Sequence, residues 1–223
     1  MAALCTPVIM VVMAIASPTR QDLVRRGQGL EYFTIGYNSL EGLVSIVAGF
    51  IAGSVSLIGF GLDSIIEVAS GAALLWRLHH DLDHSSREQM ERTSLRIVGG
   101  CFLALALYIL YESGSTLIRH EATERSIPGI IVAAASVVVM PLLARAKRRV
   151  AAGIKSGAMR ADSRQADFCT YLSAILLGGL LLNALLGWWW ADPVAGVVMV
   201  PIIAKEGMDG VMARPCCDSC GNH

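Results

Sequence analysis

Residues 59–69 read Gly59-Phe60-Gly61-Leu62-Asp63-Ser64-Ile65-Ile66-Glu67-Val68-Ala69 and place two acidic side chains inside an apolar segment. In a helix of about 3.6 residues per turn, Asp63 and Glu67 are one turn apart and about 40° from one another, so they share one face. Each charge placed at the centre of a lipid bilayer costs on the order of 3 kcal/mol. Two carboxylates on one face of a membrane-spanning helix therefore indicate a cation site.

The composition around this stretch predicts an all-α membrane protein. Of the 223 residues, 54% are hydrophobic and only 16% are charged, and the mean hydropathy of +0.57 is too high for an ordinary soluble domain. The apolar segments are long enough for a bundle of six transmembrane helices joined by short connections. The six predicted spans are residues 33–55, 58–76, 97–118, 127–144, 167–189 and 190–205.

Basic residues predict the orientation of this bundle. Of the 18 Lys and Arg residues, all but Arg119 and Arg125 fall before the first span, in the second and fourth connections, or at or after the end of the sixth span. The positive-inside rule then places both termini in the cytoplasm, with the protein in the plasma (inner) membrane and in contact with the lipid bilayer. The formal net charge of zero gives no indication of nucleic-acid binding, and no such partner is expected.

The predicted spans divide the chain into three parts. Residues 1–29 form an N-terminal extension, residues 30–207 the six-helix transmembrane domain, and residues 208–223 a Cys-rich cytoplasmic tail. Residues 1–16 are apolar but lack the basic start of a secretory signal. We interpret them either as a seventh span or as an extension that lies on or partly in the membrane.

Ionisable residues inside predicted spans are functional candidates when they face protein or a cavity. Besides Asp63 and Glu67, the spans or their starts contain five acids: Glu41, Glu112, Asp162, Asp167 and Asp192. No Lys or Arg is predicted deep in any span, so these acids are expected to stay protonated or to bind a cation. Glu112 is interpreted as a structural acid, and Glu41 is left open between a structural and a functional role.

The fifth span offers a second polar face. Asp162, Gln165, Cys169 and Ser173 follow at steps of three, four and four residues and share one side of a helix, whereas Asp167 points elsewhere. Thiolate and carboxylate ligands together suit Zn²⁺ and similar transition metals better than Mg²⁺ or Ca²⁺. The predicted transport site consists of Asp63, Glu67, Cys169, Asp162 and Gln165.

The tail contains a further candidate metal site. Cys216, Cys217, Cys220 and His223 lie within eight residues, and the C-x-x-C spacing of Cys217 and Cys220 can hold one tetrahedral metal ion. The alternative is a reduced, flexible end, since a disulfide framework is not expected in the cytoplasm. The His-rich and Asp-rich residues 79–84 are interpreted as a solvated loop.

Several sequence motifs, taken in the order in which they occur along the chain, resemble those of the cation diffusion facilitator family of divalent-metal exporters. Asp63 and Glu67 match the metal motif D-x-x-x-D of the family's second span, with Glu in the second place. The resemblance covers about residues 25–207. The other matching stretches are 38–44 with 53–57, Arg160-Ala161-Asp162, Ala191-Asp192-Pro193-Val194 and Lys205-Glu206-Gly207.

Two departures from the family pattern are visible. Family members usually carry H-x-x-x-D in the fifth span, where this chain has Gln165 and Cys169. Most members also continue into a soluble metal-binding domain, whereas only about 18 residues follow the sixth span here. The resemblance is therefore to a short form that lacks the C-terminal cytoplasmic domain, and the Cys-rich tail is a candidate replacement for the missing sensor.

The resemblance implies a secondary active transporter that exports a divalent transition metal, with zinc as the expected ion, in exchange for protons. It also implies a homodimer, with the metal as substrate and without a prosthetic group. Glu41 would lie behind the metal ligands or carry a linked proton.

The alternative is a non-transporting membrane protein that binds or senses metal through its tail. An enzyme with Cys169 as nucleophile is not expected, because no predicted span contains a His to serve as base. A redox carrier using Cys217 and Cys220 is not expected either, since no folded domain surrounds them.

Overall fold

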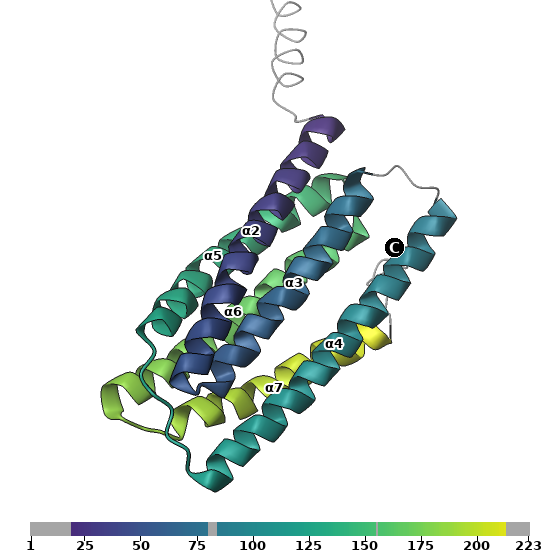
Figure 1. Ribbon diagram of the computed structural model, residues 1–223. Coiled ribbons are helices and arrows are strands. Elements are labelled where there is room, and N and C mark those ends of the chain that lie inside the picture. Colours follow the sequence, from purple (N-terminus) through teal and green to yellow (C-terminus); the bar gives the residue numbers. More distant parts are fainter. Residues whose placement is uncertain (1–18, 80–83, 155, 213–223) are drawn as a thin grey trace, which may run out of the picture.

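The computed structural model describes residues 19–79, 84–154 and 156–212. Within these residues the fold consists of six helices and no strands, which confirms the predicted helical bundle (Figure 1). The helices run up and down and are joined by short connections. Their bounds are α2 Arg20–Ala52, α3 Val55–His79, α4 His84–Arg119, α5 Ile127–Ile154, α6 Gly157–Leu186 and α7 Ala191–Val211.

Local sequence signals set several of the helix ends. Thr19 begins α2 with a capping box, because its hydroxyl accepts from the Asp22 backbone N–H while the Asp22 carboxylate accepts from the Thr19 backbone N–H. Gly53 ends α2 in the left-handed region at φ 62°, and Gly187 does the same after α6 at φ 66°. These glycines make the tight reversals that place α3 against α2 and α7 against α6.

Four helices form the central group, and two more pack against its side. In the central group α2 packs on α3, α5 packs on α6, and the two pairs are joined through α2 with α5 and α3 with α6. Helices α4 and α7 form a third pair (Figure 1). The predicted site therefore lies where α3 and α6 face each other inside the four-helix group.

The pair α4 and α7 is held close by glycine. A Cβ added to Gly99 would lie only 2.7 Å from the Gly207 carbonyl oxygen and 2.6 Å from the Val211 backbone nitrogen. Small residues at such contacts let helix backbones approach, which is how helices commonly associate in membranes.

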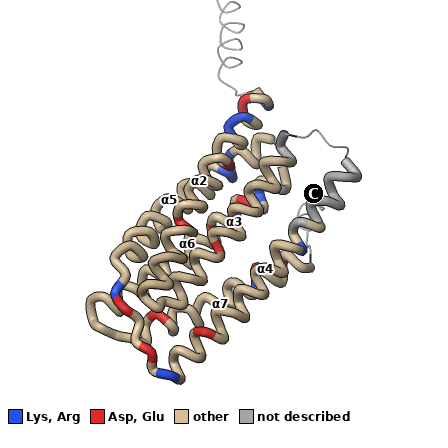
Figure 2. The backbone as a smooth tube through the Cα atoms, in the orientation of Figure 1, with Lys and Arg blue, Asp and Glu red and all other residues tan. Residues whose placement is uncertain are grey.

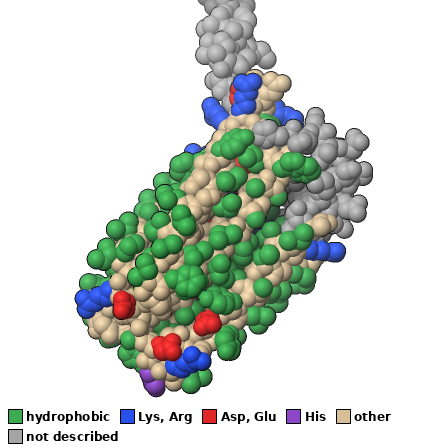
Figure 3. Space-filling view, viewed as in Figure 1, with side chains coloured by type: hydrophobic (Ala, Val, Ile, Leu, Met, Phe, Trp, Pro, Cys, Tyr) green, Lys and Arg blue, Asp and Glu red, His purple; other side chains and the backbone are tan. Residues whose placement is uncertain are grey.

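The surface of the bundle is that of a membrane protein. Phe50 and Ile118 are 71% and 81% exposed, and hydrophobic side chains cover the visible face between the charged ends (Figure 3). Figure 2 shows acidic positions inside the bundle, whereas most basic positions lie toward its ends. A surface so apolar requires lipid rather than water around it.

Five of the six helices are long and apolar enough to cross a membrane. The exception is α7, because every 18-residue stretch of its 21 residues contains at least three of the charged residues Asp192, Lys205, Glu206 and Asp209. The length and composition of the helices thus confirm five of the six predicted spans, and the sixth stays a prediction.

The helices extend beyond the predicted spans. The 33 residues of α2 are about 50 Å long, against about 30 Å for the hydrocarbon core, and α2 begins at Arg20 rather than at residue 33. Helix α5 continues to Ile154 instead of ending near residue 144. What was predicted as a polar connection over residues 145–164 is therefore mostly helix, and this difference brings a basic residue into the interior.

Candidate metal centre

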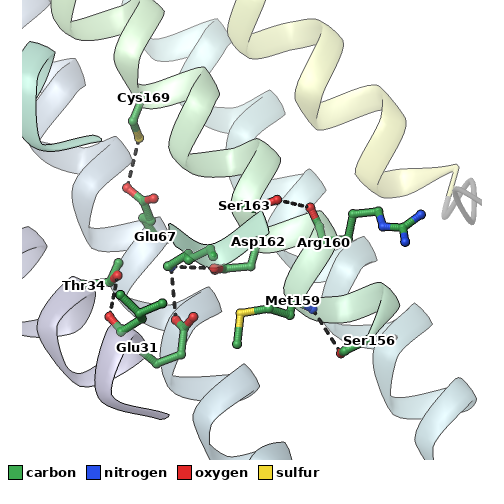
Figure 4. Close-up of polar contacts among 11 residues, drawn as sticks. Glu31, Thr34, Glu67, Ser156, Met159, Arg160, Asp162, Ser163 and Cys169 are labelled. Atoms are coloured by element: carbon green, nitrogen blue, oxygen red, sulfur yellow. Dashed lines mark hydrogen bonds and ion pairs between the residues drawn. The ribbon is translucent and has the colours of Figure 1, made fainter. Parts of the chain in front are cut away.

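Three of the five predicted ligands meet inside the bundle. The Cys169 Sγ atom, on α6, lies 3.0 Å from Asp63 Oδ2 and 3.0 Å from Glu67 Oε2, both on α3. All three side chains are buried, with exposed fractions of 1% or less. We call Asp63, Glu67 and Cys169 the thiol cluster; Figure 4 shows its contact between Cys169 and Glu67.

Close helix packing positions the thiol cluster. A Cβ added to Gly61 on α3 would lie 2.7 Å from Ile46 Cγ1 and 3.0 Å from the Gly42 carbonyl oxygen on α2. This contact brings the polar side of α2 against α3, where the Ser64 hydroxyl donates to Glu41 Oε2 at 3.1 Å. Glu41 thus lies beside the cluster, held by the residue that follows Asp63.

The thiol cluster has more electron-pair donors than its own hydrogens can satisfy. One thiol carries one proton and can donate it to only one of the two carboxylates at a time. Asp63 Oδ1 and Glu67 Oε1 are buried and have no hydrogen-bond partner among the described residues. Two carboxylates in such a place cannot both be charged without a cation near them. The cluster is therefore suited to hold either protons or a positive ion.

The donor set matches a transition-metal ion when the thiol is deprotonated. Sulfur with carboxylate oxygen fits Zn²⁺ and its neighbours. Among the described residues, however, no group of three or more His, Cys, Asp or Glu side chains stands in the arrangement of a ready metal site. In the observed state the thiol fills the space between the carboxylates as a hydrogen-bond donor, so binding a metal requires loss of that proton and a small shift of side chains.

Asp162 and Gln165 lie on the same face of α6 as Cys169 but not in the thiol cluster. Gln165 is 7% exposed, and its Nε2 has no hydrogen-bond partner in the described ranges. Asp162 Oδ2 is instead ion-paired with Lys147 Nζ at 2.5 Å. Asp167 lies off this face and pairs with Arg148 in a half-exposed position.

A buried basic residue corrects the prediction that no Lys or Arg reaches the acids. The Lys147 side chain is fully buried and contacts Glu31 Oε2 at 3.3 Å as well as Asp162. Lys147, Glu31 and Asp162 form what we call the ammonium cluster. Figure 4 labels its two acids, Glu31 and Asp162.

Sequence reasoning missed Lys147 because the run from Arg145 to Arg149 looks like a loop. Its helical spacing was the available signal. Lys147 continues the buried face of α5 at steps of three or four residues, and Glu31 lies on the buried face of α2. The buried residues of α5 on this face include Ser136, Met140, Ala144, Lys147 and Ala151.

The opposite end of the bundle uses a buried acid structurally. The Ser54 hydroxyl donates to Asp192 Oδ1 at 2.6 Å, and the Ser56 hydroxyl donates to the same oxygen. These bonds join the α2–α3 hairpin to the start of α7. Asp192 therefore has partners of its own far along the bundle from the thiol cluster.

The remaining predicted site residues lie outside the described part of the chain. These are the tail residues Cys216, Cys217, Cys220 and His223. The side chains of residues 79–84 are likewise outside it.

Buried charge in the central four helices is strongly unbalanced. Lys147 is the one buried Lys or Arg among the described side chains. The same four helices bury five acids: Glu31, Glu41, Asp63, Glu67 and Asp162. A bundle interior with this excess of carboxylates attracts cations.

Comparison with known proteins agrees with this arrangement. Residues 33–212 match the cation efflux transmembrane domain. The chain is 25% identical over 177 residues to the cation-efflux pump FieF of Shewanella oneidensis, covering 74% of this chain and 58% of that protein. It is 28% identical over 186 residues to an uncharacterized transporter of Methanocaldococcus jannaschii, covering 77% of this chain and 62% of that protein.

The chain thus spans about three fifths of the length of these two relatives, 58% and 62%. The matched region includes the thiol cluster. It also includes, in whole or in large part, each of the five described helices that can cross a membrane. The match over residues 33–212 covers most of the chain, and several of its helices can span a membrane. This chain is a multi-pass membrane protein that belongs to the cation efflux family, also called the cation diffusion facilitators.

Proposed function

We propose that this protein is a secondary active transporter that exports a divalent transition-metal ion, with Zn²⁺ as the first candidate, in exchange for protons. The observation that carries the proposal is the meeting of Asp63, Glu67 and Cys169 at 3.0 Å contacts inside the bundle. The family and the name of the Shewanella relative support cation efflux as the class of activity.

Proton exchange follows from the chemistry of the thiol cluster. A metal binds thiolate and carboxylate, so the thiol proton and any carboxyl proton must leave when the ion arrives. The same groups take protons back when the ion departs. Asp162 and Gln165 would complete the ligand set only after Asp162 leaves Lys147.

Alternating access would open the thiol cluster to each side of the membrane in turn. The central four helices hold the cluster, and the pair α4 and α7 packs on their side as a separate unit. Movement between packed units of this kind is a common way to open one side and close the other.

The membrane setting of the proposal follows the charge pattern. We infer six spans with both termini in the cytoplasm, because all but two of the 18 Lys and Arg residues lie on one predicted side. The proposal also includes the plasma (inner) membrane, a homodimer, no prosthetic group and a transmembrane domain of residues 30–207.

The test is metal uptake into proteoliposomes with and without a pH gradient. Wild type is expected to move Zn²⁺ faster when protons can flow in the opposite direction, and to alkalise the lumen in step with metal uptake because protons leave as the metal enters. Asp63→Asn and Glu67→Gln should reduce flux to background, because each replaces a charged ligand by a neutral amide of similar shape.

Glu112→Gln is the matched control, since Glu112 lies on α4 and outside the thiol cluster. It should transport like wild type. Wild-type rates in both cluster variants would contradict the proposed function. Metal flux that is lost only when residues 214–223 are removed would favour a role of the tail over the thiol cluster.

A further inference from the structure

The ammonium cluster brings side chains of three helices together in the interior. Lys147 from α5 donates to Glu31 of α2 at 3.3 Å and to Asp162 of α6 at 2.5 Å. The exposed fractions of the three side chains are 0%, 0% and 4%. Water therefore contributes little to the stability of these charges, and the groups must neutralise one another.

The ammonium can balance only one of the two carboxylates. When both acids are ionised, the cluster has one negative charge left over. Within the part of the chain that the structure describes, Glu31 Oε1 and Asp162 Oδ1 are buried without a hydrogen-bond partner. The two acids thus have donor atoms to spare, and a doubly charged ion would balance them where a single ammonium does not.

The cluster is closely packed against α3. Helix α3 contributes a glycine at this level, and a Cβ added to Gly71 would lie 3.3 Å from Glu31 Oε2 and 3.4 Å from Ile35 Cγ1. The α3 backbone can approach Glu31 because position 71 has no side chain.

The ammonium cluster is the neighbour of the thiol cluster along the bundle. Asp162, Gln165 and Cys169 share one face of α6 over seven residues, or about 10 Å. Glu67 lies between Cys169 and the two acids in Figure 4. Lys147 is 20 residues from the start of α5, about 30 Å, so the cluster lies near the end of the bundle where α5 ends and α6 begins.

We propose that Glu31 and Asp162 form a second cation site, which the Lys147 ammonium occupies while no metal ion is there. The inference rests on the proposed function, because it makes this site the station through which an ion reaches or leaves the thiol cluster. The ligand class is a divalent cation held by carboxylate oxygens. The ion enters as Lys147 moves aside on its flexible four-carbon stem, and the ammonium returns when the ion has passed.

The two sites differ in the ions they should hold. An oxygen-only set accepts Mn²⁺ or Mg²⁺ as well as Zn²⁺, whereas the sulfur of Cys169 favours the softer metals. The second site therefore lets ions pass with little discrimination among divalent metals, and the choice of metal ion is made at the thiol cluster.

Mn²⁺ binding to the purified full-length protein tests this inference without any transport. Electron paramagnetic resonance measures free Mn²⁺, so bound ions per chain follow from the lost signal. Lys147→Met should bind one more Mn²⁺ per chain than wild type, because it removes the built-in cation and leaves both carboxylates.

Two control variants separate this gain from a general effect of the substitution. Lys147→Arg keeps a cation and should show no gain. The double variant Glu31→Gln with Lys147→Met keeps the net charge of the cluster at minus one, lacks the second carboxylate and should show no gain either. If Lys147→Met does not fold, Lys147→Gln, which retains a hydrogen-bond donor for the acids, should show the same gain of one ion.

An unchanged Mn²⁺ count in both neutral variants at position 147 would overturn the second site. A gain that persists in the double variant would remove Glu31 from it. In proteoliposomes, Lys147→Met should lower both the KM and the maximal rate for Zn²⁺ several-fold. Without the competing ammonium, the second site holds the ion more tightly and releases it more slowly. Unchanged values would overturn the role of this site in ion passage. If the wild-type protein transports no metal at all, the proposed function is contradicted, whereas the Mn²⁺ binding result still applies to the second site.

Discussion

The thiol cluster and the ammonium cluster are built alike but balanced differently. Each buries two carboxylates against one group from another helix: Cys169 between Asp63 and Glu67, and Lys147 between Glu31 and Asp162. The thiol is neutral, so its two acids need protons or an imported cation. The ammonium is charged, so it balances one of its two acids. The same bundle thus buries one pair of acids against a neutral group and one pair against a built-in cation.

This difference explains why the two clusters can lie side by side. The Lys147 ammonium reduces the repulsion among the acids of the central helices. It pairs with Asp162, whose position on α6 is about 10 Å from that of Cys169.

The largest expected effect is on stability, from removing the built-in charge. Lys147→Met leaves two buried carboxylates without their partner, and breaking a buried ion pair in this way costs about 3–5 kcal/mol. Thermal unfolding in detergent should show a much lower midpoint for Lys147→Met. The double variant with Glu31→Gln should recover most of the loss, and equal loss in both variants would show that packing rather than charge is responsible.

The next effect is on transport, from removing the thiol. Cys169→Ser keeps a hydrogen-bond donor of similar size but not a soft metal ligand. Zn²⁺ flux should fall by about 100-fold or more, since even residues behind the metal ligands commonly contribute 10–100-fold. The change in unfolding midpoint should stay small. Full flux in Cys169→Ser would mean that the carboxylates act without the sulfur.

A smaller effect concerns the choice of ion. Cys169→Asp turns the thiol cluster into an oxygen-only set and should favour harder ions. The ratio of Cd²⁺ flux to Mn²⁺ flux is expected to fall by about tenfold, which corresponds to about 1.4 kcal/mol of discrimination. An unchanged ratio would place ion selection elsewhere in the protein.

The smallest effect comes from an ion pair next to the buried one. Arg148 and Asp167 join the same two helices as Lys147 and Asp162, but their side chains are 45% and 33% exposed. Pairs in contact with solvent contribute about 0–1 kcal/mol. Arg148→Ala should therefore change the unfolding midpoint little. A loss as large as that of Lys147→Met would show that burial does not separate the two pairs.

Much of the fold could be predicted from the sequence because membrane-spanning helices are recognised by their long apolar runs. The candidate ligands could also be named, because steps of three and four residues put Asp63 with Glu67 on one helical face and Asp162, Gln165 and Cys169 on another. The contact between Cys169 and the two acids could not be predicted, because it depends on α3 and α6 lying against each other in three dimensions.

The prediction from the sequence was wrong where charged residues continue a helix beyond its apolar run. The run around Lys147 resembles a loop, yet the Lys147 side chain lies inside the bundle because its partners, Glu31 and Asp162, come from two other helices. A hydropathy pattern cannot show partners so distant in the chain. It also could not decide whether α7, with Lys205, Glu206 and Asp209 near its end, crosses the membrane.

The most direct measurement is the absorption spectrum of Co²⁺ bound to full-length protein in which Cys216, Cys217 and Cys220 are replaced by Ser. If the thiol cluster holds metal, Co²⁺ should produce a sulfur-to-cobalt charge-transfer band with release of protons. The band should disappear in Cys169→Ser and weaken strongly in Asp63→Asn. A band that survives Cys169→Ser, or the absence of any band in the parent, would contradict the assignment of Asp63, Glu67 and Cys169 as the metal site.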